Sequence, residues 1–236
     1  MYKSEKYNEN RPNVGVTVVP FIYENGSIKT LLYKRSKDSE VFPERFCLPN
    51  AIFDIKKFDC LEKTAEFALK EKANVKLKHI EQIHTFSGSY IDPRIITVNS
   101  CYLSICNKND IVVLENEKFE VEWISIDSAL KKDLAFNHNE VLELAFKRLK
   151  AKAEYTPLTA HLFDEFFTIN EFRELTELLI EKKLDNSRFR DRIKKSDVLL
   201  VVENQFKNGA NRPAQLYKLN EDYKDFFYPI SLTKPN

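Results

Sequence analysis

Glycine is scarce in this sequence, since only 4 of the 236 residues are glycine. Phosphate-binding loops depend on closely spaced glycines, and neither a GxGxxG nor a GxxxxGK[ST] pattern occurs. The sequence therefore excludes the dinucleotide-binding and P-loop classes at the level of motifs. No apolar run reaches the length of a membrane span, and the polar start, MYKSEKYNENRPN, lacks the apolar core of a secretory signal. We expect a cytoplasmic protein with no membrane partner.

Other absences concern metals, disulfides and net charge. The four histidines show no HxxxH or HExxH spacing, so we predict no metal site and no cofactor. A net charge of +1 means that any nucleic-acid surface must be a local patch. The four cysteines form no CxxC pair and lie in apolar segments, which favours reduced, buried thiols over disulfides. They are Cys47, Cys60, Cys101 and Cys106.

The first two thirds of the chain alternate between strand and helix patterns. Two β-branched, aromatic-rich runs, 14–23 and 28–35, flank Asn25-Gly26, and this arrangement predicts a hairpin. Apolar residues at helical spacing predict a helix from about residue 60 to 73. Together these elements predict an α+β domain. Further strands are expected at 80–88, 94–105 and 121–126, and a closing helix at 139–153.

The last third has a different order of elements. Thr168 and Glu171 have the spacing of a capping box and predict the start of a helix over 167–180. A second helix is expected at 186–195, followed by strands at 197–204 and 215–219. Helix, turn, helix and β-hairpin form the order of a winged helix. We predict two domains, 1–154 and 155–236, with a hinge around Pro157.

Residues 46–75, FCLPNAIFDIKKFDCLEKTAEFALKEKANV, resemble the Nudix box, a loop and helix whose glutamates bind Mg²⁺ in diphosphate hydrolases. Asn74 takes the position of the closing glycine. Where the family carries three glutamates on one face of the helix, this chain has Ala68, Glu71 and Lys72. An ammonium at such a position is unfavourable for a nearby divalent cation by roughly 1–4 kcal/mol. The resemblance thus implies a Nudix frame with no catalytic residues and no metal ligands.

Over residues 12–220 the chain is similar to the Nudix-related transcriptional regulators of the NrtR type, best known from the repressor of NAD metabolism. This resemblance implies a Nudix-like mixed-sheet α/β/α domain, followed by a small winged helix-turn-helix domain that represses transcription. One departure is Asn137, which replaces the family's usual Asp before His138. The matching segments are LLYKR (31–35), IDPRIITVNSCYL (91–103), VEWISID (121–127), LAFNHNEVLELAFKRLKAKAEYTPL (134–158), FTINEFRELTELL, NSRFRDRI and NGANRPAQLYKLN (208–220).

The second helix of the winged-helix pattern is strongly basic. With Phe189 and Ile193 facing inward, its arginines and lysines can reach guanine edges or phosphates of double-stranded DNA. One winged helix contacts few phosphates, so we expect a homodimer on two half-sites of an operator, with the Nudix-like domain as the dimer platform. The candidate DNA-binding residues are Asn186, Ser187, Arg188, Arg190, Arg192, Lys194 and Lys195 in the helix, and Lys207, Asn211 and Arg212 in the wing.

The resemblance also implies a small-molecule effector in the former substrate cleft. In the NAD regulators this effector is ADP-ribose, and in relatives that control sugar use it is a pentose. Arginine side chains suit phosphate oxygens. The candidate effector-binding residues are Arg35, Asn50, Lys72, Asp92, Arg94 and Tyr102.

Two other hypotheses remain open on the sequence. The first is an active Mg²⁺-dependent Nudix hydrolase of ADP-ribose-type diphosphates with an accessory domain. The second is a winged helix that binds an acidic protein partner instead of DNA. Measurable turnover would support the first, and salt-dependent binding to random duplex DNA would count against the second.

Overall fold

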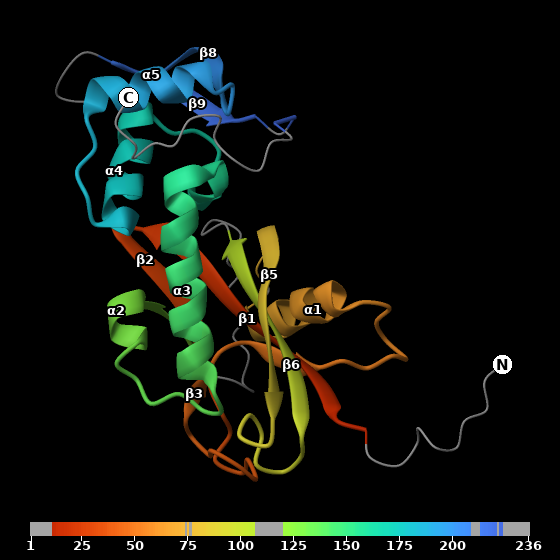
Figure 1. Ribbon diagram of the computed structural model, residues 1–236. Helices are drawn as coiled ribbons and strands as arrows, with labels where there is room; N and C mark the ends of the chain where they lie inside the picture. The colour runs from red at the N-terminus through yellow and green to blue at the C-terminus, as the bar shows by residue number, and fades with distance from the viewer. Residues whose placement is uncertain are drawn as a thin grey trace.

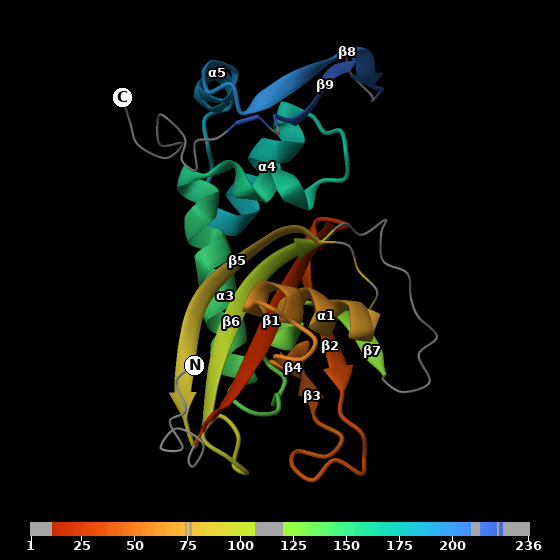
Figure 2. The same cartoon turned by 90° about the vertical axis from the view of Figure 1, so that its right-hand side faces the viewer.

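The computed structural model of this protein describes residues 11–73, 75, 77–106, 120–208, 213–220 and 222–223. A mixed sheet carries helices on both faces, and a helix pair with a hairpin lies beyond one end of it (Figures 1 and 2). Within the described residues, no helix combines the length and apolar character needed to cross a membrane. The sheet contains β1 (Asn13–Glu24), β2 (Ser27–Lys34), β3 (Phe46–Cys47), β4 (Asn50–Ile52), β5 (Leu77–Gly88), β6 (Thr97–Cys106) and β7 (Val121–Ser125).

The sheet is mixed because its two central strands run parallel while their other neighbours are antiparallel. Its order is β3-β2-β1-β6-β5, with β4 also paired to β1 and β7 to β2. Strands β1 and β6 pair in parallel from Asn13↔Thr97 to Phe21↔Ile105. The β1–β2 turn has φ values of 51° at Asn25 and 75° at Gly26, as a tight hairpin with right-handed strand twist requires. The predicted hairpin is therefore confirmed.

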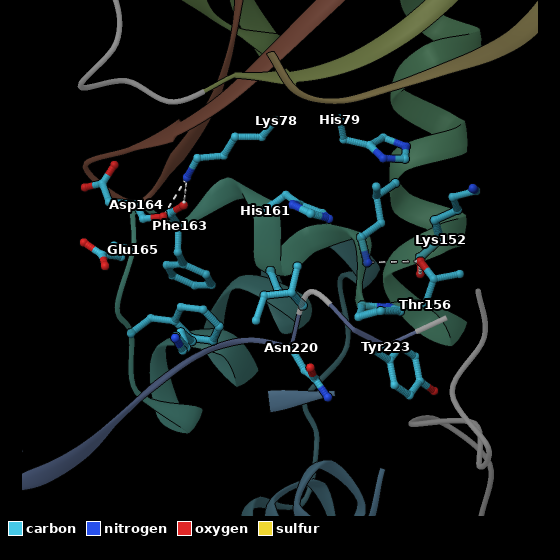
Figure 3. Close-up of a pocket in the computed structure, with 16 residues that line it drawn as sticks. Lys78, His79, Lys152, Thr156, His161, Phe163, Asp164, Glu165, Asn220 and Tyr223 are labelled. Carbon is cyan, nitrogen blue, oxygen red and sulfur yellow. Dashed lines mark hydrogen bonds between the residues drawn. The ribbon is translucent and has the colours of Figure 1, made fainter. Parts of the chain in front are cut away.

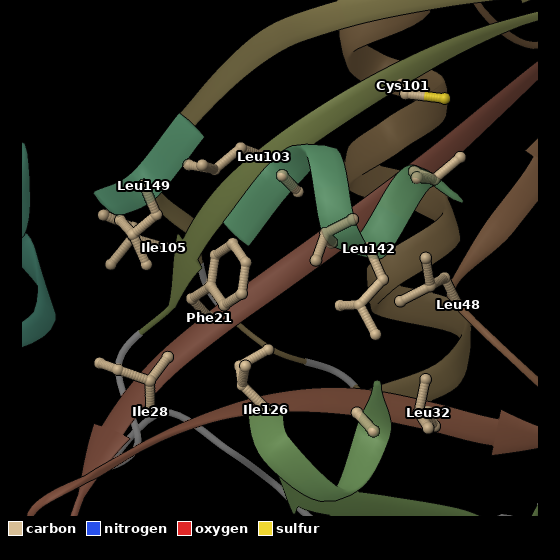
Figure 4. Close-up of a cluster of buried hydrophobic side chains, with 14 of the residues drawn as sticks. Phe21, Ile28, Leu32, Leu48, Cys101, Leu103, Ile105, Ile126, Leu142 and Leu149 are labelled. Carbon is tan, nitrogen blue, oxygen red and sulfur yellow. The ribbon is translucent and has the colours of Figure 1, made fainter. Parts of the chain in front are cut away.

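Alternate residues of the central strands supply two hydrophobic layers. On one face, Val16 and Val18 pack with Ala65 and Leu69 of α1 (Leu61–Ala73). The opposite face packs against α3 (His138–Tyr155), and Figure 4 shows Phe21, Leu103, Ile105, Leu142 and Leu149 in this layer. The result is the α/β/α arrangement that the sequence predicted.

Several boundaries differ from the predicted ones. Strand β6 begins at Thr97 and not at residue 94, and β7 ends at Ser125 because Ile126 starts the short helix α2 (Ile126–Ala129). The Ser125 hydroxyl caps that helix by accepting a hydrogen bond from the Ser128 N–H. Strands β3 and β4 and helix α2 were not predicted, because elements of two to four residues carry no periodicity.

The four cysteines carry free thiols, as predicted. Cys47, Cys101 and Cys106 are buried, whereas Cys60 is half-buried at the start of α1. Burial raises the pKa of the Cys47 thiol to about 11 and the pKa values of Cys101 and Cys106 to about 12.

The segment around Pro157, predicted as a hinge, is instead a packed connector. Residues Pro157–Leu162 form a 3-10 helix, η3, directly after α3. Its Leu158 and Leu162 belong to the hydrophobic core of the sheet domain, while Ala160 belongs to the core of the following domain. Proline starts the helical turn here because its missing N–H needs no partner at that position. The connector therefore joins two cores without an open linker.

The last third folds as a winged helix. Its elements are α4 (Ile169–Ile180), α5 (Asn186–Lys195), β8 (Leu199–Lys207) and β9 (Ala214–Leu219). Thr168 and Glu171 form the predicted capping box at the start of α4, and α5 has the predicted bounds. Strand β8 extends three residues beyond the predicted strand, through an irregularity at which Asn204 takes a φ of 58°.

Helix α4 belongs to both hydrophobic cores. Its first half contributes Ile169 and Phe172 to the winged-helix core, together with Phe189 of α5. Its second half contributes Leu175 and Leu179 to the core of the sheet domain. One helix therefore fixes the winged helix against the end of the sheet domain, as Figure 1 shows.

Glu177 links α4 to the turn that leads into α5. The carboxylate, in a residue only 6% exposed, accepts hydrogen bonds from the Leu184 N–H at 2.8 Å, Arg173 at 2.6 Å and Lys183 at 3.0 Å. Burial alone would raise the pKa of Glu177, but the Leu184 N–H and the two cations outweigh it and lower the pKa below 4.5. The charged carboxylate thereby stabilises the helix-turn-helix angle.

We expect Glu177→Gln to lower the free energy of unfolding by about 3–5 kcal/mol, because it leaves Arg173 without its buried partner. The control is Glu174→Gln, since Glu174 is exposed and contacts Arg173 only at 3.9 Å. Because the pKa of Glu177 is depressed in the folded state, its contribution is present above pH 4.5 and is lost as the pH falls. Urea unfolding at several pH values measures both effects, and equal losses in the two variants would contradict this role.

Candidate functional site

Lys72 lies in the last turn of α1, within the group of side chains that the resemblance assigns to the effector cleft. Its Nζ is 4.6 Å from the centre of the Tyr33 ring and 3.8 Å from Oε2 of Glu71. The residue is only 7% exposed, and burial lowers the pKa of its ammonium group. The aromatic face and the carboxylate oppose that effect by favouring the charged form. A buried cation thus stands where the resemblance places a metal-binding glutamate.

Asn50 also contacts Tyr33, the residue whose ring faces the Lys72 ammonium. The Tyr33 hydroxyl donates a hydrogen bond to Oδ1 of Asn50 at 2.6 Å. The loop before Asn50 is held by His138, whose Nδ1 accepts a hydrogen bond from the Leu48 N–H at 3.0 Å. Burial lowers the pKa of His138 to about 3, so the ring is neutral at physiological pH and keeps this acceptor.

Arg35 and the Asp92–Arg94 pair border this group. The Arg35 Nε donates to the carbonyl oxygen of Val41 at 3.1 Å, and its guanidinium carbon lies 4.8 Å from the centre of the Phe136 ring. Arg94 donates to both carboxylate oxygens of Asp92, at 2.9 and 2.7 Å. These bonds lower the pKa of Asp92, and the charge of Arg35 lowers it further. Arg35 and Arg94 therefore both lie close enough to Asp92 to lower its pKa.

Tyr102 lies elsewhere than predicted. It is 1% exposed in the layer beneath α1, and its hydroxyl donates to Oε1 of Glu62 at 3.2 Å. Glu62 is in the first turn of α1, whereas Lys72 is in the last turn, about 15 Å further along the axis. Tyr102 is therefore a packing residue, and the structure brings together five of the six candidates.

Tyr33 and Phe136 join the candidate site from the structure alone, and Asn137 follows Phe136 in the chain. Tyr33 and Phe136 carry the ring contacts of Lys72 and Arg35. Asn137 is 9% exposed, and within the described part of the chain its Oδ1 and Nδ2 make no hydrogen bond. Buried amides are seldom left without partners, so this side chain is available for a ligand. Only its substitution for the family's Asp drew attention to it in the sequence.

The residues of α1 do not fit a magnesium ion. Mg²⁺ requires several oxygen ligands in octahedral geometry. Ala68 supplies no donor and is fully buried, Lys72 supplies an ammonium, and only Glu71 offers a carboxylate on this edge. Among residues 11–73, 75, 77–106, 120–208, 213–220 and 222–223, no group of three or more His, Cys, Asp or Glu could hold a metal ion. The cleft is suited to an anionic ligand.

The second candidate site is the outer face of α5, at the end of the molecule remote from the sheet (Figures 1 and 2). Phe189 and Ile193 are buried, as predicted. At about 100° per residue, the opposite face is formed by five exposed residues. They are Ser187, Arg188, Asp191, Lys194 and Lys195.

Three other predicted residues of α5 lie at the sides of this face. Asn186 is exposed in the first turn, where recognition helices contact bases. Arg190 donates from Nη2 to Oδ1 of Asn170 at 3.2 Å, which turns it toward the start of α4. Arg192 is half-buried beside the core. The basic surface is therefore narrower than the sequence suggested, with Asp191 in its middle.

The predicted wing residues are described only in part. Lys207 donates to Oε1 of Glu171 at 2.6 Å, so it ties the hairpin to the capping box of α4. Backbone hydrogen bonds between Phe167 and Tyr217, 3.0 and 2.8 Å long, add a second attachment. Asn211 and Arg212, like Asn74 of the Nudix-like helix, lie outside the described residues.

These two sites define a class of protein: a Nudix-type sheet domain packed against a winged helix. Residues 159–219 match the family model described as the NrtR DNA-binding winged helix domain. An "ADPR responsive transcriptional repressor NtrR" from Acinetobacter baylyi is 30% identical over 233 residues, which is 98% of this chain and 91% of that protein. The chain belongs to the NrtR family.

Solved structures agree with this assignment. Shewanella oneidensis NrtR complexed with a 27mer DNA is 29% identical, with a TM-score of 0.85 over 93% of this chain and 99% of that chain. The Nudix domain of the same protein, complexed with ADP ribose, is 27% identical, with a TM-score of 0.56 over 62% of this chain and 94% of that chain. The predicted fold and family are thus confirmed.

We expect Mg²⁺ to leave the thermal unfolding of this protein unchanged, because a ligand stabilises a fold only if the folded state binds it. The comparison is potassium chloride at equal ionic strength, which separates specific binding from screening. Differential scanning calorimetry measures the midpoint in both salts. A midpoint higher in Mg²⁺ that falls back on Glu71→Gln would show that the cleft holds a metal.

Proposed function

We propose that this protein is a ligand-responsive transcriptional repressor, whose catalytically inactive Nudix-like domain binds ADP-ribose or a related nucleotide or sugar. The buried Lys72 ammonium carries this proposal, because it takes the place of a metal ligand while supplying positive charge to a diphosphate. The winged helix binds an operator in double-stranded DNA. We place the domain boundary near residue 155, within the packed connector.

The cleft supports anion recognition without metal. Lys72 and Arg35 supply two cations near one aromatic residue, Tyr33, and Arg94 supplies a third at the border. An arginine can hold phosphate oxygens through two parallel hydrogen bonds. The amides of Asn50 and Asn137 offer hydrogen bonds to ribose hydroxyls. A cytoplasmic sensor of a diphosphate-linked metabolite fits this set of side chains.

The DNA-binding proposal rests on α5. Its outer face presents Arg188, Lys194 and Lys195, and its first turn presents Asn186 and Ser187. Asp185 fixes the start of the helix, since its carboxylate accepts a hydrogen bond from the Arg188 N–H at 2.8 Å. A second copy is needed to contact two half-sites, so we propose a homodimer.

We expect Lys195→Ala to weaken binding to all DNA sequences and to reduce the slope of log affinity against log salt by about 1. Arg188→Ala should instead cost about 1–3 kcal/mol on the operator if the guanidinium reads a guanine. Fluorescence anisotropy at several salt concentrations measures both. Lys147→Ala, an exposed lysine of α3, is the control, and equal effects of Lys147→Ala and Lys195→Ala would reject α5 as the DNA contact.

We expect ADP-ribose to change the occupancy of a protein–DNA complex, because a ligand that prefers one dimer geometry shifts the population toward it. Lys72→Met should raise the ADP-ribose concentration needed by about tenfold or more, since a lost charge-assisted contact costs roughly 1.5–3 kcal/mol. Native gel titration measures this. Unchanged occupancy at saturating ADP-ribose would reject this effector, and the same titration with a pentose would then test the sugar alternative.

The active hydrolase is the second candidate, favoured by the preserved Nudix frame of α1. An assay of the AMP and ribose 5-phosphate formed from ADP-ribose with Mg²⁺, run on wild type and on Lys72→Glu, separates the two proposals. We expect no turnover by either protein, because Ala68 remains without a carboxylate in both. Turnover by the wild type would establish the enzyme.

A further inference from the structure

A cavity of about 800 Å³ lies between the sheet domain and the winged helix, and Figure 3 shows its lining. One wall comes from β5, the end of α3 and the connector η3, and the other includes the end of β9 and Tyr223. This volume is within the range of sites for small organic ligands, roughly 300–1,000 Å³. The cavity shares no lining residue with the cleft around Lys72.

The lining offers cations to a phosphate. It contains three lysines, Lys78, Lys152 and Lys218, together with the carboxylates of Asp164 and Glu165. Lys152 is paired with Glu81, so Lys78 and Lys218 are the cations that a ligand could contact. Lys78 donates to the carbonyl oxygens of Phe163 and Asp164, at 2.5 and 2.6 Å, and is thereby held at the cavity wall.

A pair of imidazoles gives the cavity a flat surface. The His79 and His161 rings stack with centroids 5.7 Å apart and an interplanar angle of 24°. In Figure 3, His161 lies in the middle of the lining, between Lys78 and His79 on one side and Asn220 and Tyr223 on the other. The buried Nε2 of His79 makes no hydrogen bond to any described residue, since Oε2 of Glu81 is 3.6 Å away.

The protonation state of His161 reports the local field. Burial, followed by the charges of His79 and Lys78, lowers the pKa of His161 to about 4. Glu81, the nearest carboxylate to His79, is already engaged by Arg148 at 2.8 Å and by Lys152. A bound anion would offset the charge of Lys78 beside the ring.

We propose that this junction cavity binds a phosphate-bearing small molecule of nucleotide size, with the phosphate near the lysines and a flat ring against the imidazoles. A molecule held by both walls bridges the winged helix and the sheet domain, in addition to the contacts that α4 makes with both cores. It is thus a second effector site, distinct from the cleft. Its influence on DNA rests on the proposed function, whereas the binding itself does not.

Isothermal titration calorimetry on the full chain tests the binding, with AMP and inorganic pyrophosphate as probes. The titrations use the Lys72→Ala variant, which weakens binding in the cleft, and the Lys218→Glu comparison assigns the remaining heat to the cavity. We expect AMP to bind at least as tightly as pyrophosphate, because its base can stack on the imidazoles. Lys218→Glu in the same background should weaken both probes by about tenfold or more. Lys147→Glu, the same charge change on the exposed side of α3, should leave both unchanged.

The imidazole resonances provide a second readout of binding. A lysine that only stabilises the fold would not make these resonances respond to AMP. In nitrogen-15 NMR of the wild type, the resonances of His79 and His161 should shift together as AMP is added. The midpoint of this shift should equal the midpoint of the AMP titration measured by calorimetry. Absence of binding in the Lys72→Ala variant would overturn the proposal. So would pyrophosphate binding more than tenfold tighter than AMP, or equal binding by the Lys218→Glu and Lys147→Glu proteins. None of these measurements requires DNA, so they remain decisive if the proposed repressor function fails.

Discussion

Helix α4 packs into two hydrophobic cores at once, and the rest of the molecule is arranged around that constraint. Leu175 and Leu179 are bound into the sheet domain, while Ile169 and Phe172 belong to the winged helix. Protein interiors are close-packed and resist continuous deformation. A change at the sheet domain therefore moves the winged helix as a body. Regulation by reorientation of two such bodies in a dimer is consistent with this packing, whereas a loosely tethered DNA-binding domain is not.

The chemistry of the candidate site in the sheet domain follows from one difference. The Lys72 ammonium stands where the Nudix box has a glutamate carboxylate. In a metal-dependent hydrolase the cation is an exchangeable ion with open coordination positions. Here the cation is the Lys72 side chain, which is anchored to α1 and braced by Tyr33 and Glu71. An ammonium can hold phosphate oxygens but offers no position for an activated water. The proposed binding without turnover would suit a sensor, because its ligand must persist while bound.

Much of the architecture was predictable because local patterns agreed with the global fold. The Asn25-Gly26 turn, the capping box at Thr168 and the bounds of α5 each follow from side-chain chemistry within a few residues. What the sequence could not reveal depends on contacts between distant residues. Lys207 meets Glu171 across 36 positions, and the packed connector is visible only once both cores exist.

In the candidate sites, too, some features follow from neighbouring residues in the sequence and others depend on contacts between distant residues. The helical period of α5 predicted which residues face outward, but the turn of Arg190 toward Asn170 required the position of α4. Tyr102 matched a family segment, yet the register of β6 places its ring under α1. The cavity beside His161 combines residues from 78 to 223, and no local pattern marks it.

The buried cysteines have a consequence for what the protein can respond to. The nucleophile that peroxides and electrophiles attack is the thiolate, and with a pKa of about 11 Cys47 holds roughly one part in ten thousand as thiolate at neutral pH. Cys101 and Cys106 hold still less. The Cys47 thiol donates to the carbonyl oxygen of Tyr33, whose ring contacts Lys72, so oxidation there would disturb the candidate ligand site. Burial opposes that oxidation by keeping the Cys47 thiol protonated.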